Sequence, residues 1–307
     1  MSVIGIDTSN YTTSIACFDG HGGVNCSRLL PVKQGELGLR QSDAVCAHIK
    51  SLPELSGRLF SDAQIDEIKA VGVSTRPRAV EGSYMPCFMV GYSHAKMMAD
   101  LLQIPLVEVS HQQGHVAASL WSADHLELMD EPHLAWHLSG GTTELLLVEP
   151  EGKNVRCSRI GGTTDISAGQ LIDRTGQLLE LPFPSGKHID ALSKEAQMKE
   201  TFQVKCPELE FSLSGVQNKV QRFHDQHGIP TETAAYALRC VAKAVYLATE
   251  NALKRYPGYR VVFSGGVASN SMLREVISPL NPIFSQPQFS TDNAMGVAVL
   301  AHRMIQE

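Results

Sequence analysis

One short pattern occurs near the start of each half of the chain: an apolar run, a turn of small polar residues and a second apolar run. In the first half the turn is Thr8 to Thr13, followed by the apolar run Ser14 to Phe18. In the second half Leu134 to Leu138 lead into Ser139 to Thr143 and then Glu144 to Val148. Each pattern predicts a β-hairpin. Two such hairpins, one opening each half, indicate a duplicated folding unit.

Amphipathic stretches follow each hairpin, and strands that alternate with helices predict an α/β protein with partly parallel sheets. We expect a first lobe at residues 1–105, with a C-terminal helix at 293–307 packing back on it, and a second lobe at 106–292. The segment from Pro184 to Pro207 is the least regular and is expected to be a lid or an insertion. The expected helices are Asp43–Leu55, Phe88–Leu102, Ile166–Leu179, Thr231–Tyr256 and Ala294–Ile305. The long helix at Thr231–Tyr256 is expected to start at Thr231 or Thr233, and a strand is expected at Tyr259–Phe263.

The composition limits the class of protein. The chain has 307 residues, of which 43% are hydrophobic and 19% charged, so it can build a sizeable core. It contains no apolar run long enough to span a bilayer and no signal peptide at its N-terminus, and its seven cysteines form no C-x-x-C pair. These features predict reduced thiols, a cytoplasmic location and no association with membranes. The net charge of −6, without any Lys/Arg block, means that binding RNA would need a local basic patch or a partner protein.

The stretch His111-Gln112-Gln113-Gly114-His115 places two imidazoles four residues apart, on one face of a helix, where they can share one metal ion. It follows an expected strand, Pro105 to Val109, and precedes the helical Val116 to Leu120. The zinc-protease signature needs a Glu directly after the first His as general base, and Gln112 cannot take up a proton. The pattern therefore predicts a metal site but not peptide hydrolysis by that mechanism.

A catalytic metal usually has three protein ligands, and two histidines with one carboxylate are a common set. Asp292 is the best candidate for the third ligand, although its default interpretation is the N-cap of the last helix. His137, Glu144 and Asp190 are competitors. A histidine pair at this spacing is also found in purely structural roles.

Two turns have the composition of phosphate-binding loops. Ser139 to Thr143 offers small residues whose N–H groups can point at one spot, although an ordinary hairpin turn has the same composition. Thr8-Ser9 is similar but lacks glycine. Ser264 to Asn270 lies between a strand and a helix, where glycines let a ligand approach the backbone. Asn270 is expected either to cap that helix or to bind a nucleoside.

Asp165, Gly169 and Asp173 share one helical face, because each lies four residues from the next. Two acids that flank a residue without a side chain could hold a ribose or a metal-bound ligand. In the structural alternative, Asp165 is an N-cap and Asp173 pairs with Arg174 or Lys187.

Taken together and in order, these motifs resemble the TsaD family and its archaeal and eukaryotic relatives. These are tRNA threonylcarbamoyladenosine synthase subunits, once classed as sialoglycoprotein endopeptidases. The resemblance extends from Gly5 to Asn293. The matching pieces are Gly5 to Ser9, His111 to His115, Leu138 to Gly141, Thr164-Asp165 through Gly169 to Asp173-Arg174, Phe211 to Gly215, Gly265-Gly266 through Asn270, and Asp292-Asn293.

The resemblance implies an actin/Hsp70/sugar-kinase type of fold, with two similar α/β lobes and a nucleotide cleft between them. It also implies one divalent metal ion, iron or zinc, held by His111, His115 and Asp292. In the family this ion polarises the threonylcarbamoyl group of an acyl-adenylate, which is transferred to N6 of adenosine 37 in tRNA. Expected ligands are therefore ATP or the acyl-adenylate, and expected partners are TsaB-like and TsaE-like subunits and tRNA, in a heterodimer or homodimer.

By matching positions, the resemblance implies that Leu138, Ser139, Gly140 and Gly141 cradle phosphate. It also implies that the adenosine is held by Asp173, Gly186, Asp190 and Asn270. The small residues of the turns complete the expected nucleotide and substrate site, namely Thr8, Ser9, Thr142, Gly265 and Gly266.

The chain departs from the family pattern in three places, as expected of a divergent paralogue. The acidic residues that usually follow the first Thr-Ser are replaced by Asn10, Tyr11 and Thr12. A Gly-Pro-Gly stretch is replaced by Thr75 to Arg78, and Gly161-Gly162 stands where Gly-Glu is usual.

Three alternative functions remain open at this point. They are an O- or N-carbamoyltransferase with a non-tRNA acceptor, a non-catalytic nucleotide-binding partner subunit, and a protease, which Gln112 disfavours.

Overall fold

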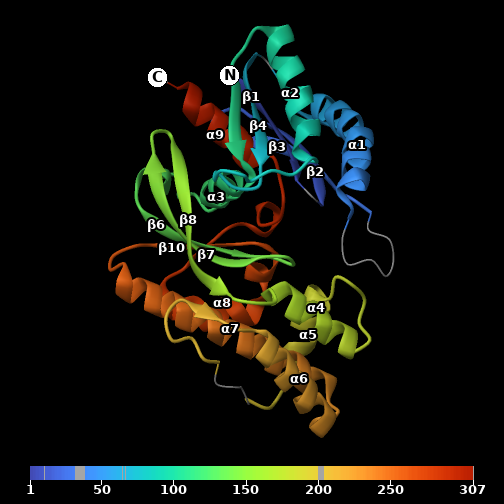
Figure 1. The fold of residues 1–307 in the computed structure, drawn as a ribbon, viewed down its shortest axis with the longest axis vertical. Helices are drawn as coiled ribbons and strands as arrows, with labels where there is room; N and C mark the ends of the chain where they lie inside the picture. Colours follow the sequence, from blue (N-terminus) through green and yellow to red (C-terminus); the bar gives the residue numbers. More distant parts are fainter. Residues whose placement is uncertain (10, 32–38, 64, 66, 200–203, 307) are drawn as a thin grey trace. The chain divides into compact units, whose positions relative to one another are not determined.

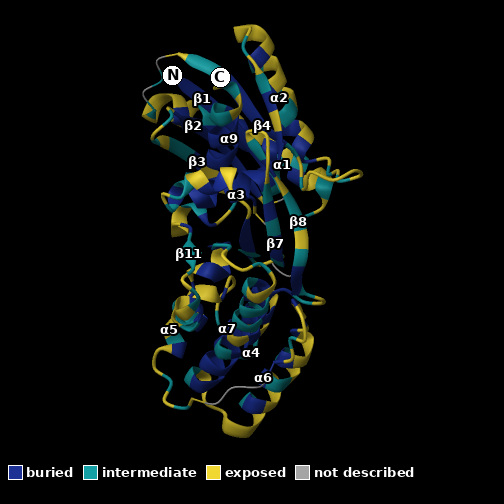
Figure 2. Cartoon of the chain, turned by 90° about the vertical axis from the view of Figure 1, so that its left-hand side faces the viewer, coloured by how far each residue is buried: buried dark blue, intermediate teal, exposed yellow. Residues whose placement is uncertain are grey.

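The first predicted hairpin is formed by β1 (Ser2–Ser9) and β2 (Thr12–Phe18), which pair antiparallel. The computed structural model describes residues 1–9, 11–31, 39–63, 65, 67–199 and 204–306, so Asn10 of the first turn lies outside the described residues. Every residue of both strands is buried, as Figure 2 shows in dark blue. Burial on both faces explains why these strands read as apolar runs rather than as alternating patterns.

Three further strands complete the first sheet, in the order β3-β2-β1-β4-β5. β4 pairs parallel with both β1 and β5. The added strands are β3 (Gly23–Leu29), β4 (Ile68–Arg76) and β5 (Leu106–Ser110). The helices around this sheet are α1 (Gln41–Asp62), α2 (Phe88–Leu102), α3 (His111–Ser122) and α9 (Met295–Ile305). α1 contacts β2 and β3, α2 contacts β1 and β4, and α9 contacts β1, β2, β4 and α3 (Figure 1).

The chain divides into two compact units. Unit 1 contains residues 1–131, 149–157 and 292–307, and unit 2 contains residues 132–148 and 158–291. This division differs from the expected lobe boundary at residue 105. Residues 106–131 join unit 1 because β5 pairs with β4 and α3 packs on α9. The histidine pair therefore belongs to unit 1 and not to the second lobe.

Unit 2 contains the second predicted hairpin, β6 (His133–Leu138) and β7 (Thr143–Glu151), which pair antiparallel. The sheet order is β11-β10-β6-β7-β8-β9, and β10 pairs parallel with β6 and β11. The remaining strands are β8 (Asn154–Thr163), β9 (Glu210–Phe211), β10 (Val261–Ser264) and β11 (Ile283–Phe284). The order β8-β7-β6-β10-β11 repeats β3-β2-β1-β4-β5, which confirms the duplicated unit.

The helices of unit 2 gather around one long helix, α7 (Pro230–Arg255), which contacts α4, α5, α6 and α8 (Figure 1). α7 begins at Pro230 rather than at Thr231 or Thr233, because proline presets the first helical turn. The other helices are α4 (Ala168–Leu178), α5 (Gly186–Ser193), α6 (Ser214–His227) and α8 (Ser271–Ile277). Short 3-10 helices cover Leu126–Asp130, Gly266–Ser269, Ser278–Leu280 and Pro287–Phe289.

The segment expected to be irregular, 184–207, contains α5, so Gly186 and Asp190 lie on a helix rather than in a loop. Residues 200–203 of that segment lie outside the described residues. None of the seven cysteines, which all lie in the described ranges, is part of a disulfide. Across the described ranges, no helix combines the length and the apolar composition that a membrane crossing requires.

Candidate metal centre and nucleotide-binding turns

The start of α3 is fixed by a capping box, which places His111 at the first helical position. Ser110 Oγ accepts the N–H of Gln113, and the Gln113 side chain accepts the N–H of Ser110 at 2.9 Å. Gln113 Nε2 also donates to the carbonyl of Val155 at 2.7 Å, and the N–H of Gln112 donates to the carbonyl of Pro77 at 3.0 Å. The two glutamines in the motif therefore anchor the helix.

Three predicted ligand atoms meet at the N-terminal end of α3. His111 Nε2 lies 3.0 Å from His115 Nε2, and Asp292 Oδ1 lies 3.1 Å from His115 Nε2 and 3.6 Å from His111 Nε2. Three corners of a tetrahedron around a metal ion at 2.0–2.1 Å would be separated by about 3.3 Å. Two imidazoles and one carboxylate also match the donor preference of zinc and ferrous iron. The residues present therefore fit one such ion.

Asp292 reaches this position because α9 lies very close to α3. A Cβ atom on Gly296 would stand 1.8 Å from the carbonyl oxygen of Gly114, so this approach requires glycine. The N-cap of α9 is Ala294, without a side-chain cap, and the N–H of Met295 is accepted by Asn293 Oδ1. The default interpretation of Asp292 as the N-cap is therefore wrong, and its carboxylate contacts the histidines instead.

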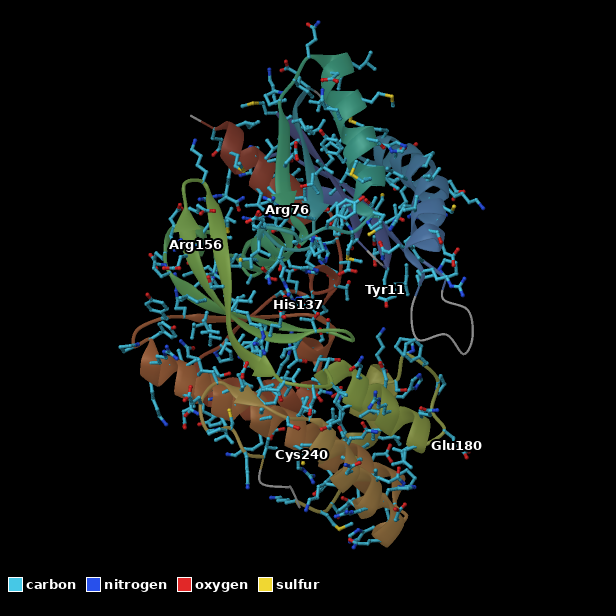
Figure 3. All side chains as sticks on the ribbon, in the orientation of Figure 1. Tyr11, Arg76, His137, Arg156, Glu180 and Cys240 are labelled. Atoms are coloured by element: carbon cyan, nitrogen blue, oxygen red, sulfur yellow. The ribbon has the colours of Figure 1, made fainter. Side chains whose placement is uncertain are left out.

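The competing third ligands are not part of this cluster. Unit 2 contains His137, Glu144 and Asp190. Among the described residues, one group of at least three potential ligands has its ligand atoms within 4.8 Å of one another, and its members are His111, His115 and Asp292. His137, labelled on β6 in Figure 3, lies 3.5 Å from Ser264 Oγ through Nδ1.

The titratable groups of the cluster shift one another strongly. Burial lowers the pKa of His111, but attraction by Asp7 and a hydrogen bond to Asp292 outweigh it and raise that pKa to about 10. Burial raises the pKa of Asp292, yet its contacts with His111 and His115 hold it well below the usual range. Without a metal ion, a charged His111 therefore lies between two carboxylates, and an ion would replace its proton.

Asp7 was not among the expected site residues. It ends the apolar part of β1, is completely buried, and accepts a hydrogen bond from His111 Nδ1 at 3.0 Å. One signal in the sequence could have found it, because a lone acid in a fully buried strand needs a specific partner.

In unit 2, two stretches of backbone pack against the turn from Leu138 to Thr142. Ser167 Oγ donates to the carbonyl of Gly140 at 2.6 Å, and a Cβ atom on Gly169 would meet Gly140 Cα at 2.5 Å. Gly265 has φ +91°, and a Cβ atom there would lie 2.1 Å from the carbonyl oxygen of Leu138. The predicted turn thus lies against the start of α4 and against Gly265.

The exposed side of this turn is open. The N–H groups of Gly140 and Gly141 have no acceptor among the described residues, and a Cβ atom on either would meet nothing within 4 Å. The same open space surrounds the Cα atoms of Gly186 and Gly266. Such unoccupied backbone donors are what a phosphate-binding turn presents.

Two of the predicted adenosine-binding residues contact each other. Asn270 Nδ2 donates to Asp190 Oδ1 at 2.7 Å, and Asn270 Oδ1 caps α8 by accepting the N–H of Leu273. Both roles expected for Asn270 are therefore compatible, since the cap uses only its oxygen. Asp173 accepts the N–H of Ser185 at 2.8 Å, next to Gly186, rather than pairing with Arg174 or Lys187.

Two other predicted residues have structural partners. Asp165 is not the N-cap of α4, which is Ser167; its carboxylate instead accepts hydrogen bonds from Ser212, Leu213 and Ser214. The Thr8 hydroxyl donates to the carbonyl of Cys87 and accepts the N–H of Gly91. Ser9, by contrast, is buried with a hydroxyl that has no partner among the described residues.

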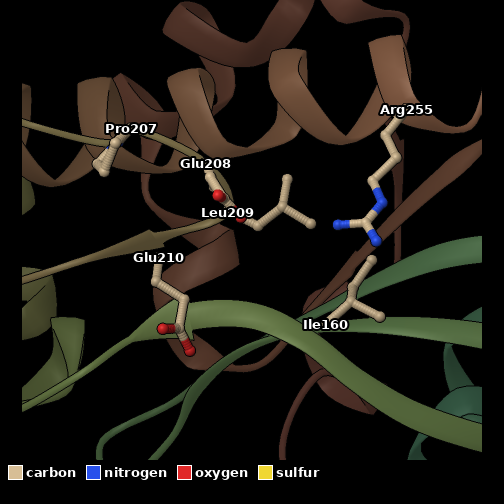
Figure 4. Close-up of a pocket in the computed structure, with 6 residues that line it drawn as sticks. All are labelled: Ile160, Pro207, Glu208, Leu209, Glu210 and Arg255. Carbon is tan, nitrogen blue, oxygen red and sulfur yellow. The ribbon is translucent and has the colours of Figure 1, made fainter.

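Tyr11, labelled in Figure 3, is 38% exposed and stands in the first turn where acids were expected from the family pattern. A separate hollow of about 280 Å³ in unit 2, shown in Figure 4, is lined by Ile160, Pro207, Glu208, Leu209, Glu210 and Arg255. None of the predicted site residues lines it, so it carries no part of the site.

Comparison with known proteins identifies the family. The family model of TsaD, described as tRNA N6-adenosine threonylcarbamoyltransferase, matches residues 34–299. The chain belongs to the TsaD family. The TsaD proteins of Carboxydothermus hydrogenoformans and Thermosipho africanus, both named tRNA N6-adenosine threonylcarbamoyltransferase, are 29% and 30% identical to it. These matches cover 98% and 100% of the chain and 91% and 95% of the relatives. As a TsaD-family member, the chain is an enzyme of the transferase class.

Solved structures confirm the actin/Hsp70/sugar-kinase type of fold expected for a TsaD-family protein. Full-length HypF in its phosphate- and nucleotide-bound form superposes with a TM-score of 0.62 at 15% identity, over 100% of this chain and 56% of that chain. The ROK hexokinase from Thermus thermophilus superposes with a TM-score of 0.55 at 14% identity, over 99% of each chain.

Proposed function

We propose that this chain transfers the threonylcarbamoyl group of threonylcarbamoyl-adenylate to N6 of adenosine 37 in tRNA. The names of its relatives support the reaction class and the acceptor. The observation that carries the proposal is the donor set of His111, His115 and Asp292, whose three atoms lie 3.0–3.6 Å apart. These residues would hold one divalent ion, iron or zinc, which supplies Lewis-acid polarisation of the acyl carbonyl.

The surrounding residues favour acyl transfer over hydrolysis. The N–H of Gln112 donates to Pro77, and its side chain cannot take a proton from water, so the motif contains no general base of the protease type. In unit 2, the free N–H groups of Gly140 and Gly141 would donate to phosphate oxygens of the nucleotide. Asp190 and Asn270 would hold its adenosine part, and AMP is the leaving group.

The need for a partner follows from charge, and the family resemblance implies which subunits these are. A chain with a net charge of −6 and no basic block needs help to hold tRNA, because neutralising phosphates supplies much of the affinity for nucleic acid. We therefore propose that TsaB-like and TsaE-like subunits complete the active assembly, with the chain in a heterodimer or a homodimer.

The test is to incubate the full chain with its TsaB- and TsaE-like partners, threonylcarbamoyl-adenylate and tRNA. The modified nucleoside is then measured by mass spectrometry after digestion. We expect product with the wild-type chain and none with His115→Ala. Absence of product, while a known TsaD works in the same mixture, would refute the tRNA part of the proposal.

One observation favours a second candidate, a carbamoyltransferase with a non-tRNA acceptor. The first turn carries Tyr11 and Thr12 where the family pattern expects acids. Hydrolysis of carbamoyl phosphate to carbamate and phosphate, followed by reaction of the carbamate with ATP to give carbamoyl-adenylate and pyrophosphate, would support this candidate. Threonylcarbamoylation of tRNA without any turnover of carbamoyl phosphate would exclude it.

A further inference from the structure

We propose that Asp7 is a positioning residue for the candidate metal centre. Its buried carboxylate binds Nδ1 of His111 and so presents Nε2 of that ring to the ion. This inference rests on the metal site of the proposed function and deepens it, because it assigns a role to a residue outside the ligand set.

The contact joins two elements that are distant in the sequence. Asp7 lies near the carboxyl end of β1 with no exposed surface, and its Oδ1 lies 3.0 Å from Nδ1 of His111 at the start of α3. The hydroxyl of Ser74, on the neighbouring strand β4, donates to the same oxygen. Asp7 is therefore held from the side of the sheet and faces the edge of the His111 ring that points away from His115.

This contact selects one tautomer of His111. A neutral imidazole carries a single N–H, and an ionised carboxylate can only accept a hydrogen bond. Nδ1 must therefore carry the proton, which leaves the lone pair of Nε2 free for a metal. Nε2 is the atom that lies 3.0 Å from His115 Nε2 and 3.6 Å from Asp292 Oδ1.

The net charge of the metal-loaded cluster also favours a carboxylate at Asp7. Two neutral imidazoles, one divalent ion and Asp292 would carry a net charge of +1, and a buried unpaired charge is costly. A second carboxylate, Asp7, brings the total to zero without occupying a ligand position. Its role is thus electrostatic as well as orienting.

Asp7 needs a positive group beside it in either state of the site. Asp7 Oδ2 is buried and has no partner among the described residues. A buried carboxylate with one unsatisfied oxygen destabilises a protein unless a positive group compensates for it. In the metal-free protein a protonated His111 is that group, and in the loaded protein the ion takes its place.

The experiment uses the full-length protein, stripped of metal, and the variants Asp7→Asn and Ser74→Ala. The dissociation constants for Zn²⁺ and Co²⁺ are measured by competition with a chromophoric chelator, and the visible spectrum of bound Co²⁺ is recorded. We expect Asp7→Asn to weaken binding by about 10- to 100-fold and to change the Co²⁺ spectrum. Its metal-free melting temperature should fall, because Asp7 also pairs with the charged His111 of the metal-free protein, so both affinities are measured at a temperature where both proteins are folded. The control Ser74→Ala removes a contact of Asp7 but leaves the carboxylate on His111, so it should retain binding to within about threefold.

A measurement on the wild-type chain covers the case in which Asp7→Asn fails to fold. Nitrogen-15 NMR of the protein loaded with ¹¹³Cd reports which ring nitrogen of His111 carries the metal and which carries a proton. We expect the metal on Nε2 and the proton on Nδ1. Metal on Nδ1, or equal affinities for wild type and Asp7→Asn, overturns the role of Asp7 alone. A wild-type chain that binds no metal overturns the metal site of the proposed function as well.

Discussion

Replacing Asp165 by asparagine should destabilise unit 2 without changing any of the three candidate metal-binding residues. The carboxylate of Asp165 accepts the hydroxyls of Ser212 and Ser214 at 2.5 and 2.6 Å, the N–H of Leu213 at 2.8 Å and the N–H of Ser214 at 3.2 Å. It thereby ties the turn after β8 to the start of α6. Asparagine keeps one acceptor oxygen but places an amide donor against two hydroxyls.

Two routes give the magnitude of this effect. Burial raises the pKa of Asp165, but the hydrogen bonds from Ser212 and Ser214 outweigh it and lower the pKa from 3.8 to about 2. By linkage that difference corresponds to about 2.5 kcal/mol, which we discount to about 1–2 kcal/mol because Asp165 is exposed and solvent screens it. A hydrogen bond to a charged group contributes roughly 1.5–3 kcal/mol, and screening by solvent lowers this figure to about 1–2 kcal/mol. The two routes agree on about 1–2 kcal/mol.

Thermal unfolding followed by circular dichroism should show a melting temperature lower by about 2–8 °C for Asp165→Asn. Because the pKa is lowered in the folded state, the stabilisation is present above about pH 3.8 and is lost as the pH falls through about 2. Hydrogen exchange should become faster at the start of α6. The matched control is Asp225→Asn on the same helix, where the Gln221 side chain is the one hydrogen-bond partner of the carboxylate among the described residues. A melting temperature for Asp165→Asn within 1 °C of that control would refute the reasoning.

Three further predictions concern the two sites. The pKa of His111 is raised from 6.5 to about 10, so its protonation stabilises the metal-free protein fully below about pH 6.5, and this stabilisation is lost as the pH rises through about 10. Urea unfolding of the metal-free protein should therefore show a free energy of unfolding that falls between these pH values, and Zn²⁺ should abolish this pH dependence. Gly296→Ala places a Cβ atom against the Gly114 carbonyl, so it should lower the free energy of unfolding by about 3 kcal/mol or more and weaken metal binding. The control Gly57→Ala, in open space on α1, should leave the stability measured by calorimetry unchanged or raise it. In Gly266→Ala the added Cβ atom meets no protein atom within 4 Å, so the melting temperature should not change, but the Cβ atom occupies the space that a nucleotide would need. Titration calorimetry should show at least about tenfold weaker ATP binding, and equal affinity would contradict a nucleotide at this turn.

Local patterns in the sequence predicted the elements of the fold well. Helix Phe88–Leu102 has the predicted bounds, and both hairpins form where their polar turns placed them. Repetition of the hairpin also indicated the duplicated sheet, because the hairpin opens the same strand order in both units. Each of these features depends on residues that are close together in the sequence.

Contacts between distant residues were not predictable in the same way. Asp7 and His111 are 104 positions apart, and nothing in either local pattern shows that β1 ends beside α3. Asp165 resembled a helix cap because of its spacing, but its partners lie 47 to 49 positions later. For Asp292, the sequence offered both a helix cap and a third metal ligand, and the structure does not use it as the cap.

The discontinuity of unit 1 also sets the order in which its candidate metal centre can form in a growing chain. Asp292 lies 177 positions after His115, and a ribosome that adds about 5–20 residues per second needs roughly 10–35 s to synthesise that interval. During this time β1 and α3 can emerge, but the third ligand does not yet exist and α9 is not there to pack on α3. Stable loading of an ion at this candidate site would therefore wait until the chain beyond residue 292 has left the ribosome.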